Sequence, residues 1–424
     1  YLPIESVEEP QTYDNRLKRT FLYQAFKDTV EKLSDKPFVK PVSVKSLPKE
    51  MQFLIDDMDG CGTNLTNFCK ALMYDLCLHG ITHVYTDYPV IEQNITGNPI
   101  SIEEEKLLKA RPYFLRIPAP NLIGWRSERD TSSTHYLSQV RFKESVSESA
   151  GQFIEEVQEY IRVVTPYGWA LYKYLEAKGD LKSSWYIKES GVHSFGSIPI
   201  TTIYTTKKAL MVSDPPLESL AELNLQHWQS SSDQRNILRF ARFALLFGKK
   251  IKDRDDDQLI IGPSNIIHTN NIDASLSYVE HSGQAITAGE RDLERLEMQM
   301  AIAGHRPMAK DRSTATEITS DEDKNLSSIK TWIQNLEIGI TKAFRNAAKW
   351  MKVTIPDDFS VDIYSDFRVG LFATTDIELL HKMLEKNQIT LETFLFEVRR
   401  RGLLHELLDI KEEAEGVKKQ VNVL

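Results

Sequence analysis

Residues 283–350 specify two helices joined by a sharp break, and any fold of this chain has to accommodate both. The first helix is predicted from about Thr287 to Ala303, where Gly304-His305-Arg306-Pro307 ends it. The second is predicted from Ala315 to Trp350, because apolar residues recur every three or four positions along it. At 1.5 Å per residue it would be roughly 50 Å long, which exceeds an ordinary domain core. We therefore expect it to cross several layers or to lie in an assembly.

The start of the second helix carries a capping signal. In Thr314-Ala315-Thr316-Glu317, the Thr hydroxyl and the Glu carboxylate can satisfy free backbone N–H groups reciprocally. Asp321, Glu322 and Asp323 follow in its first turns, where the helix dipole favours negative charge. This boundary is therefore well specified by local chemistry.

Composition limits the classes of partner. The 424 residues carry a formal net charge of −9, and 41% of them are hydrophobic. This length suggests about two to four domains with a core of ordinary size. Apolar runs are too short to cross a bilayer, so we expect no membrane partner. A chain this acidic should repel duplex DNA on average, which confines any DNA contact to local basic patches.

Short strands are expected between Ile81 and Tyr204, where polar and apolar residues alternate between turn residues. With the surrounding helices, this antiparallel β-rich region predicts an α+β fold. The polar stretches Ser127–Thr134 and Ser145–Gly151 are expected as loop tips. The expected strands are Ile81–Thr86, Tyr113–Ile117, Leu122–Arg126, Leu137–Phe142, Gln158–Val164, Ala170–Glu176, Ser184–Lys188 and Ile200–Tyr204.

Helices are expected at Tyr13–Leu33, Leu65–Leu78 and Asp214–Phe247, the last opening with Asp-Pro-Pro and ending at Gly248. Lys249–Glu280 is too small to fold alone, so we expect an αβ tip held between two helices. After the long helix, Ser360–Tyr364 is expected to be a strand returning to the earlier sheet. Helices are expected after it, the second of them capped by Thr390.

Two stretches resemble metal sites in part. Asp57-Met58-Asp59-Gly60-Cys61-Gly62 is similar to a calcium loop, but the first and twelfth ligand positions would fall on Ile55 and Thr66, which do not fit. A turn leading into the next helix is the favoured interpretation. His79 and His83 have helical spacing without the HExxH signature. The three cysteines form no CxxC pair. We predict neither a metal nor another cofactor.

The chain shows no catalytic signature: Walker A, GxGxxG, GxSxG and kinase motifs are all missing from the sequence. Glu290, Glu294 and Glu297 lie at i, i+4 and i+7 of one helix, a spacing that by itself indicates a solvated face opposite a core face. The triplet Arg399-Arg400-Arg401 either contacts phosphate or complements the dipole at a helix C-terminus.

The order of these parts resembles the portal protein of a tailed bacteriophage. A β-rich region leads to a long helix, a small tip, a second helix, a loop and a very long helix, before a last strand and a helical end. Local wording is similar to one portal family at stretches spread over almost the whole chain: Asp59–Leu65, Thr86–Pro89, Asn121–Arg126, Pro216–Asp233, Thr314–Glu317 and Arg400–Leu404.

Portal proteins are twelve-fold rings at one capsid vertex, and the resemblance implies their fold. That fold has an antiparallel β-rich wing, a two-helix stem, a small αβ clip, a long helix crossing the wing and a helical crown. The implied segments are 1–214 (wing, first part), 215–248 (first stem helix), 249–281 (clip), 282–303 (second stem helix), 304–314 (channel loop), 315–372 (long helix and wing, second part) and 373–424 (crown).

The resemblance also implies roles for charged residues. Glu290, Glu294 and Glu297 would line the channel as stacked acidic rings that let DNA slide. The DNA-facing channel loop would comprise His305, Arg306, Pro307, Met308, Lys310, Asp311 and Arg312. Residues docking the motor or adaptors would be Lys249, Lys250, Lys252, Asp253, Arg254, Asp255, Asp256 and Asp257. A basic patch in the crown would comprise Arg399, Arg400 and Arg401.

The implied partners are further copies of the chain in a dodecameric ring, double-stranded DNA passing without sequence specificity, the terminase large subunit, tail or adaptor proteins, and capsid and scaffold proteins. The implied location is the virion, at a capsid vertex, after assembly in the host cytoplasm. Two other functions stay open. One is a cytosolic enzyme with its site in the β-rich domain. The other is another head–tail structural ring, although such chains are usually far shorter.

Replacing Lys310 and Arg312 with Ala should leave ring formation intact and impair DNA packaging or retention, because these cations would touch the passing phosphates. The native mass of the particle reports ring formation, and the DNA content of heads reports packaging. Heads that fill normally with both substitutions would contradict a channel role for this loop.

Overall fold

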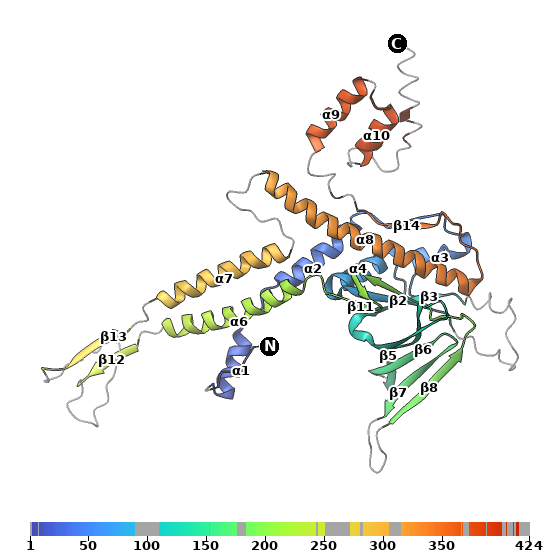
Figure 1. The fold of residues 1–424 in the computed structure, drawn as a ribbon. Coiled ribbons are helices and arrows are strands. Elements are labelled where there is room, and N and C mark those ends of the chain that lie inside the picture. The colour runs from blue at the N-terminus through green and yellow to red at the C-terminus, as the bar shows by residue number, and fades with distance from the viewer. Residues whose placement is uncertain are drawn as a thin grey trace. The chain divides into compact units, whose positions relative to one another are not determined.

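A computed structural model divides the chain into two units, Tyr1–Asp362 and Ile363–Leu424 (Figure 1). All pairings between the described strands are antiparallel, so the fold is α+β with antiparallel sheets. The structure describes residues 2–6, 8–89, 110–151, 153–175, 184–242, 245–250, 272–279, 283–304, 315–365, 367, 373–386, 388–400, 404, 410 and 413–414.

Two sheets form the β-rich part of the first unit. In the larger sheet the strands pair in chain order: β4 (Leu122–Arg129), β5 (His135–Gly151), β6 (Ile154–Thr165), β7 (Gly168–Leu175) and β8 (Ser184–Val192). In the smaller sheet, β2 (Ile81–Asp87) lies between β3 (Tyr113–Pro118) and β9 (Ile200–Tyr204). All eight strands expected from the sequence are therefore present, most of them longer than predicted.

The prediction of a loop tip at Ser145–Gly151 is wrong. These residues form the end of β5 and pair with the stretch of β6 that begins at Ile154. Backbone bonds to a neighbouring strand outweigh the low strand propensity of serine and glycine, because strand preference depends strongly on context. The other expected tip is a turn only from Asp130 onward, since Ser127 to Arg129 belong to β4.

The two sheets share one apolar cluster, formed by Tyr85, Ile117, Val140, Phe142, Val164, Ile198 and Ile200. Beside it, Arg162 of β6 donates to Asp87 of β2 (Nη1···Oδ2 3.1 Å) and to Glu144 of β5 (Nε···Oε2 2.7 Å). Burial raises the pKa of Asp87 and outweighs the opposing effect of Arg162. Because Arg162 and Asp87 are both buried, each would be costly without the other.

The long helix α8 (Ala315–Met351) ends one residue beyond its predicted end and packs on β9 and β2. Asn335 donates to the backbone oxygen of Tyr204 (3.0 Å), and the helix comes so close at Gly339 that an added Cβ would lie 2.5 Å from Cγ1 of Ile203. Its fully buried face consists of Ile333, Leu336, Ile340, Ala343, Phe344 and Ala347. This apolar stripe is the one that its periodicity predicts.

The N-terminal region is broken where one helix was predicted. The expected helix Tyr13–Leu33 is two helices, α1 (Pro10–Arg19) and α2 (Ala25–Asp35). At the break, Thr20 has an extended backbone. A hydrogen bond joins its hydroxyl to that of Ser232, which lies in a helix far along the chain (3.1 Å). A tertiary contact therefore overrides a helical pattern that is continuous in sequence.

Shorter elements complete the first unit. α4 (Leu65–His79) ends one residue later than predicted, and the last strand, β14 (Ser360–Asp362), pairs with β1 (Ser43–Lys45) instead of the earlier sheets. The remaining elements are α3 (Phe53–Asp56), β10 (Lys207–Ala209), β11 (Val212–Ser213) and the 3-10 turns Lys36–Phe38, Lys49–Met51 and Ala119–Asn121.

The second unit contains α9 (Ala373–Glu385) and α10 (Leu391–Arg400) in its described part. Thr390 caps α10 as predicted, because its Oγ1 accepts from the backbone N–H of Thr393 (3.2 Å). The rings of His381 and Phe394 join the two helices, with centroids 6.2 Å apart.

Gly80 ends α4 with φ +71°, and an added Cβ would overlap the backbone oxygen of Asp214. We expect Gly80→Ala to lower the free energy of unfolding by about 2–4 kcal/mol, through left-handed strain and this overlap together. Gly196→Ala is the matched control, because Gly196 has φ +74° and nothing within 4 Å of an added Cβ. Urea unfolding of both variants measures the difference, and equal losses would show that the overlap costs nothing.

Candidate functional site: the two-helix stem

Two antiparallel helices and a two-stranded β ribbon follow one another in the chain within the first unit (Figure 1). α6 (Glu218–Ala241) leads to β12 (Leu245–Lys249), and β13 (Ser275–Val279) leads back to α7 (Gln284–Ala303). The two strands pair antiparallel, from Leu245 opposite Val279 to Lys249 opposite Ser275. We refer to α6 and α7 together as the stem.

The prediction that the first stem helix continues to Phe247 is wrong. α6 ends at Ala241, and Leu245, Leu246 and Phe247 lie in β12. A short apolar run is compatible with either a helix or a strand by periodicity, and here cross-strand pairing decides. The expected αβ tip, predicted to begin at Lys249, therefore begins with a strand that starts at Leu245.

The stem combines few buried apolar side chains with polar contacts. Of the residues in α7, all of which are described, the buried ones are Leu296 and Met300. Between these two, Oε1 of Glu297 lies 3.3 Å from Nε2 of His227, and nearer the start of α7 Gln234 donates to the backbone oxygen of Ile286 (2.8 Å). Hydrogen bonds of this kind each contribute roughly 1 kcal/mol, so α7 is held modestly and leaves most of its surface open.

The acidic stripe predicted for the second stem helix is present on α7. Glu290 and Glu294 are exposed, and within the described residues neither has a hydrogen-bond or ion-pair partner. Glu297 is 54% exposed at its side chain and contacts His227 of α6. Two of the three carboxylates are therefore free to act on something outside this part of the chain.

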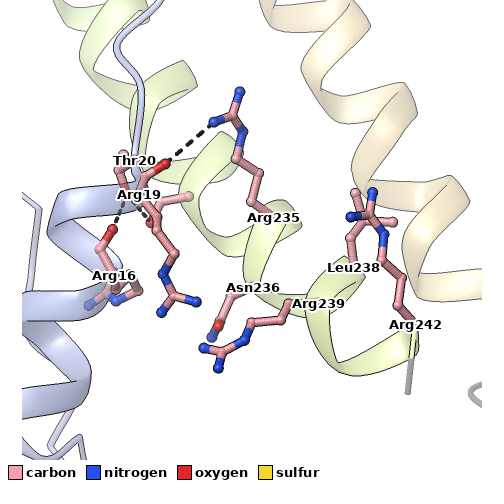
Figure 2. A pocket seen from close by; sticks show the side chains of 9 residues that line it. Arg16, Arg19, Thr20, Arg235, Asn236, Leu238, Arg239 and Arg242 are labelled. Atoms are coloured by element: carbon pink, nitrogen blue, oxygen red, sulfur yellow. Dashed lines mark hydrogen bonds between the residues drawn. The ribbon is translucent and has the colours of Figure 1, made fainter. Parts of the chain in front are cut away.

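The N-terminal segment from α1 to the start of α2 lies against α6, a role that sequence reasoning missed. We call this segment the strap. The backbone N–H of Phe26 donates to Oδ1 of Asn224 (3.1 Å), so a stem side chain caps the start of α2. Figure 2 shows the second contact, in which Arg235 donates to the backbone oxygen of Arg19 (3.4 Å). The polar residues of α6 that are buried here, such as Asn224, were the signal that could have revealed this contact.

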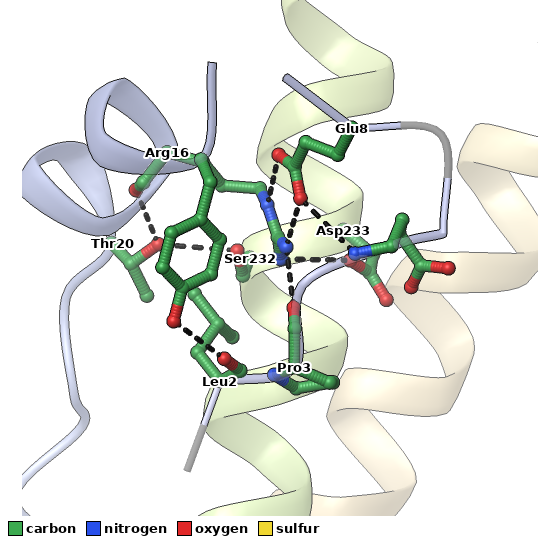
Figure 3. A network of polar contacts seen from close by, with 9 residues as sticks. Leu2, Pro3, Glu8, Arg16, Thr20, Ser232 and Asp233 are labelled. Carbon is green, nitrogen blue, oxygen red and sulfur yellow. Dashed lines mark hydrogen bonds and ion pairs between the residues drawn. The ribbon is translucent and has the colours of Figure 1, made fainter. Parts of the chain in front are cut away.

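A network around Arg16 locks the strap in place (Figure 3). Arg16 donates to both oxygens of Glu8 (2.9 and 2.6 Å) and to the backbone oxygen of Pro3 (2.6 Å). Its Nη1 also lies 4.0 Å from Oδ1 of Asp233 on α6. The hydrogen bond from Arg16 holds the pKa of Glu8 below its usual value. Arg16 is thus already committed to partners within the chain.

The remaining predicted site residues are only partly described. Lys249 is exposed in β12, and Lys250 forms an ion pair with Asp273 (3.0 Å). Arg399 lies in α10, with its guanidinium 5.9 Å from the ring centroid of Phe396. Outside the described residues, or without a described side chain, are His305, Arg306, Pro307, Met308, Lys310, Asp311, Arg312, Lys252, Asp253, Arg254, Asp255, Asp256, Asp257, Arg400 and Arg401.

The stretch Asp57–Gly62, which is similar to a calcium loop, forms a turn that leads into the next helix, as predicted. Asp57 Oδ1 accepts from the backbone N–H groups of Gly60 and Gly62, and Asn64 caps α4 through Asn67 (2.9 Å). The Asp57 carboxylate also pairs with Arg111. Its oxygens are therefore occupied by internal donors.

The histidine pair does not come together as a ligand pair. His79 ends α4, and His83 is buried in β2, where Nδ1 lies 3.0 Å from the hydroxyl of Thr202. Burial lowers the pKa of His83 to about 4. Among the residues that the structure describes, no three His, Cys, Asp or Glu side chains gather as a metal site.

Comparison with known proteins gives one family match. A family model described as a domain of unknown function (DUF4055) matches residues 216–351, which run from α6 through α7 to α8 and make up about a third of the chain. A search of curated proteins finds no match. None of the helices in the described part of the chain is long and apolar enough to span a membrane.

Three solved structures overlap with the chain at low identity. A chain in the neck of an empty GTA particle, computed with C6 symmetry, has a TM-score of 0.46 and 9% identity, covering 88% of this chain and 90% of that one. A chain in the virion of a native gene transfer agent particle has 0.43 and 10%, covering 92% and 94%. A chain in the neck of a native particle with C12 symmetry has 0.43 and 9%, covering 93% and 94%.

The contact between α6 and α7 at Gly289 can be tested directly. An added Cβ at Gly289 would overlap Oε1 of Gln234 and displace its bond to Ile286. We expect Gly289→Leu to destabilise the stem by about 1–3 kcal/mol, because a larger group would force the helices apart. Ala288→Leu, at an exposed neighbouring position, should change stability by less than about 0.5 kcal/mol.

Limited proteolysis of the stem measures this effect, because local opening exposes cleavage sites before the whole chain unfolds. Faster cleavage in Gly289→Leu alone is the expected result. Equal cleavage of the two variants would show that α6 and α7 do not pack closely at Gly289.

Proposed function

We propose that this chain is the portal protein of a tailed bacteriophage. Copies would form a ring, with a dodecamer expected, at one capsid vertex of the virion. The ring would conduct double-stranded DNA without sequence specificity during packaging and ejection. It would dock the terminase large subunit first and tail or adaptor proteins later, and it would contact capsid and scaffold proteins during assembly in the host cytoplasm.

One observation carries the proposal: the stem helices α6 and α7, with the ribbon between them in the chain, are followed by the long helix α8, which packs across a sheet. This is the order of stem, clip, second stem helix and crossing helix that the sequence resemblance implies. By that resemblance the β-rich part is the wing, the ribbon belongs to the clip, and residues 373–424, which lie in the second unit, are the crown.

The open surface of α7 supports assembly into a ring. Met298 and Ile302 lie four residues apart on α7, and they are 56% and 59% exposed. Neighbouring exposed apolar groups such as these would extend into a larger contact surface where another copy of the chain packs against α7. In a closed ring each copy would meet its two neighbours through two different faces, a head-to-tail contact.

The charges of α7 fit a DNA conduit. Glu290, Glu294 and Glu297, repeated around an axis, would form acidic rings that repel phosphate and keep the duplex from adhering. The residues 304–314 between α7 and α8 would bring Arg306, Lys310 and Arg312 to the passing backbone as a weak, salt-sensitive contact. Because the sequence carries no Walker A motif, a separate ATPase would supply the energy for packaging.

Native mass measurement and images of the purified full chain test the ring. The expected result is a closed ring with a central hole. A stable monomer at assembly concentrations would overturn the proposal, and so would a ring in which α7 lies far from the symmetry axis.

Reversing the charge of Glu290 and Glu294 to Lys should slow DNA translocation by about two- to tenfold, most at low salt, because phosphates would adhere to the wall. Glu218→Lys with Glu222→Lys is the matched control, since both residues are exposed on α6 and the charge change is the same. A packaging assay with DNA protection as readout measures both. Equal slowing in the two double variants would show that the acidic stripe does not face the DNA.

A further inference from the structure

A basic groove is lined by residues of α1 and α6 where these two helices meet (Figure 2). Its volume is about 530 Å³. Five arginines line it. Arg16 and Arg19 belong to α1, Arg235 and Arg239 belong to α6, and Arg242 directly follows the last residue of α6. We call it the arginine groove. It is separate from the acidic stripe, which lies on α7.

Among the residues that the structure describes, four of these five guanidinium groups have no acidic partner. Arg16 is committed to Glu8, as described above. Arg19, Arg235, Arg239 and Arg242 are exposed, and no carboxylate among the described residues lies within 4.0 Å of them. In a chain with net charge −9, an uncompensated set of four arginines around one groove is a local exception. It marks a surface suited to an anionic group.

The helix dipole accounts for only part of this set. Cations in the last turn of a helix complement its C-terminal carbonyls, which explains Arg19 and Arg239. Arg235 lies more than a turn before the end of α6, so the dipole does not reach it. Arg235, Arg239 and Arg242 recur at i, i+4 and i+7 and therefore form one stripe about 10 Å long.

We propose that the arginine groove docks an acidic segment of a partner protein. Guanidinium groups bind carboxylates through two parallel hydrogen bonds, and a groove of this volume admits a few side chains. Carboxylates on alternate residues of an extended segment are about 6.7 Å apart. That spacing is close to the roughly 6 Å axial step between Arg235 and Arg239.

The groove suits a peptide better than a duplex. A groove of about 530 Å³ admits a few side chains, so a rigid duplex would touch the rim and not the floor. Asp233 also stands near the rim, with 70% of its side chain exposed, and would repel a continuous row of phosphates. A flexible acidic segment can place its carboxylates on the arginines and avoid this group.

The position of the groove ties it to the ribbon. Arg242 precedes the start of β12 by three residues, so a bound segment would lie next to the surface proposed to dock motor or adaptor proteins. This location rests on the proposed function, whereas binding in the groove does not. The two can therefore fail separately: native mass reports the ring, and a binding assay with the same chain reports the groove.

The test uses the full chain and a fluorescein-labelled dodecapeptide in which Asp and Glu alternate with Ser and Gly. Fluorescence anisotropy should show salt-sensitive binding, and Arg239→Gln with Arg242→Gln should weaken it by about tenfold or more, since charged hydrogen bonds are lost. Arg291→Gln with Arg295→Gln, on exposed positions of α7, is the matched control and should change binding less than about threefold. Circular dichroism verifies that both variants fold.

Several results would overturn the proposal. Equal weakening in both double variants would show non-specific attraction. Tighter binding of a duplex oligonucleotide through Arg239 and Arg242 would make the groove a nucleic-acid site. Loss of the ring in the groove variant, with the peptide still bound, would make it a contact between copies. A peptide in which Asn and Gln replace Asp and Glu should not bind, and binding by that peptide would exclude charge recognition.

Discussion

The small number of buried side chains in α7 limits how firmly α7 is held against α6. Among the described residues of α7, Leu296 and Met300 are the ones that leave solvent, while polar contacts such as His227 to Glu297 hold the rest to α6. A helix pair with so little apolar contact gains little stability from burial, at about 25 cal/mol per Å². It needs support from elsewhere, and the chain supplies part of that support.

Two other parts of the chain, the N-terminal strap and α8, supply this support. The N-terminal strap clamps α6 through Asn224 and Ser232, and α8 is anchored across β9 by a continuous apolar face. Between these anchors, the stem carries exposed carboxylates on α7 and the arginine groove at α6 and α1. A stem that carries negative charge on one helix and positive charge on the other can meet different classes of molecule at each.

Local patterns predicted what depends on neighbours in sequence. The eight strands between Ile81 and Tyr204 follow from alternation, the extent of α8 follows from its helical period, and the Thr390 cap follows from capping chemistry. The side chains of the capping box predicted at Thr314–Glu317 lie outside the described part of the chain. The predictions failed at three places where distant contacts decide. Thr20 breaks the first helix to reach Ser232, Leu245 pairs with Val279, and Ser145 to Gly151 pair with β6.

The sequence alone determined most of the elements, the acidic stripe on Glu290, Glu294 and Glu297, and the order of parts that resembles a portal protein, because periodicity and local charge are properties of short segments. Tertiary structure alone decided that α1 lies against α6 and that Arg19 and Arg235, more than two hundred positions apart, line one groove. No local pattern encodes that meeting, since it depends on which buried polar group of α6 the N-terminal strap satisfies.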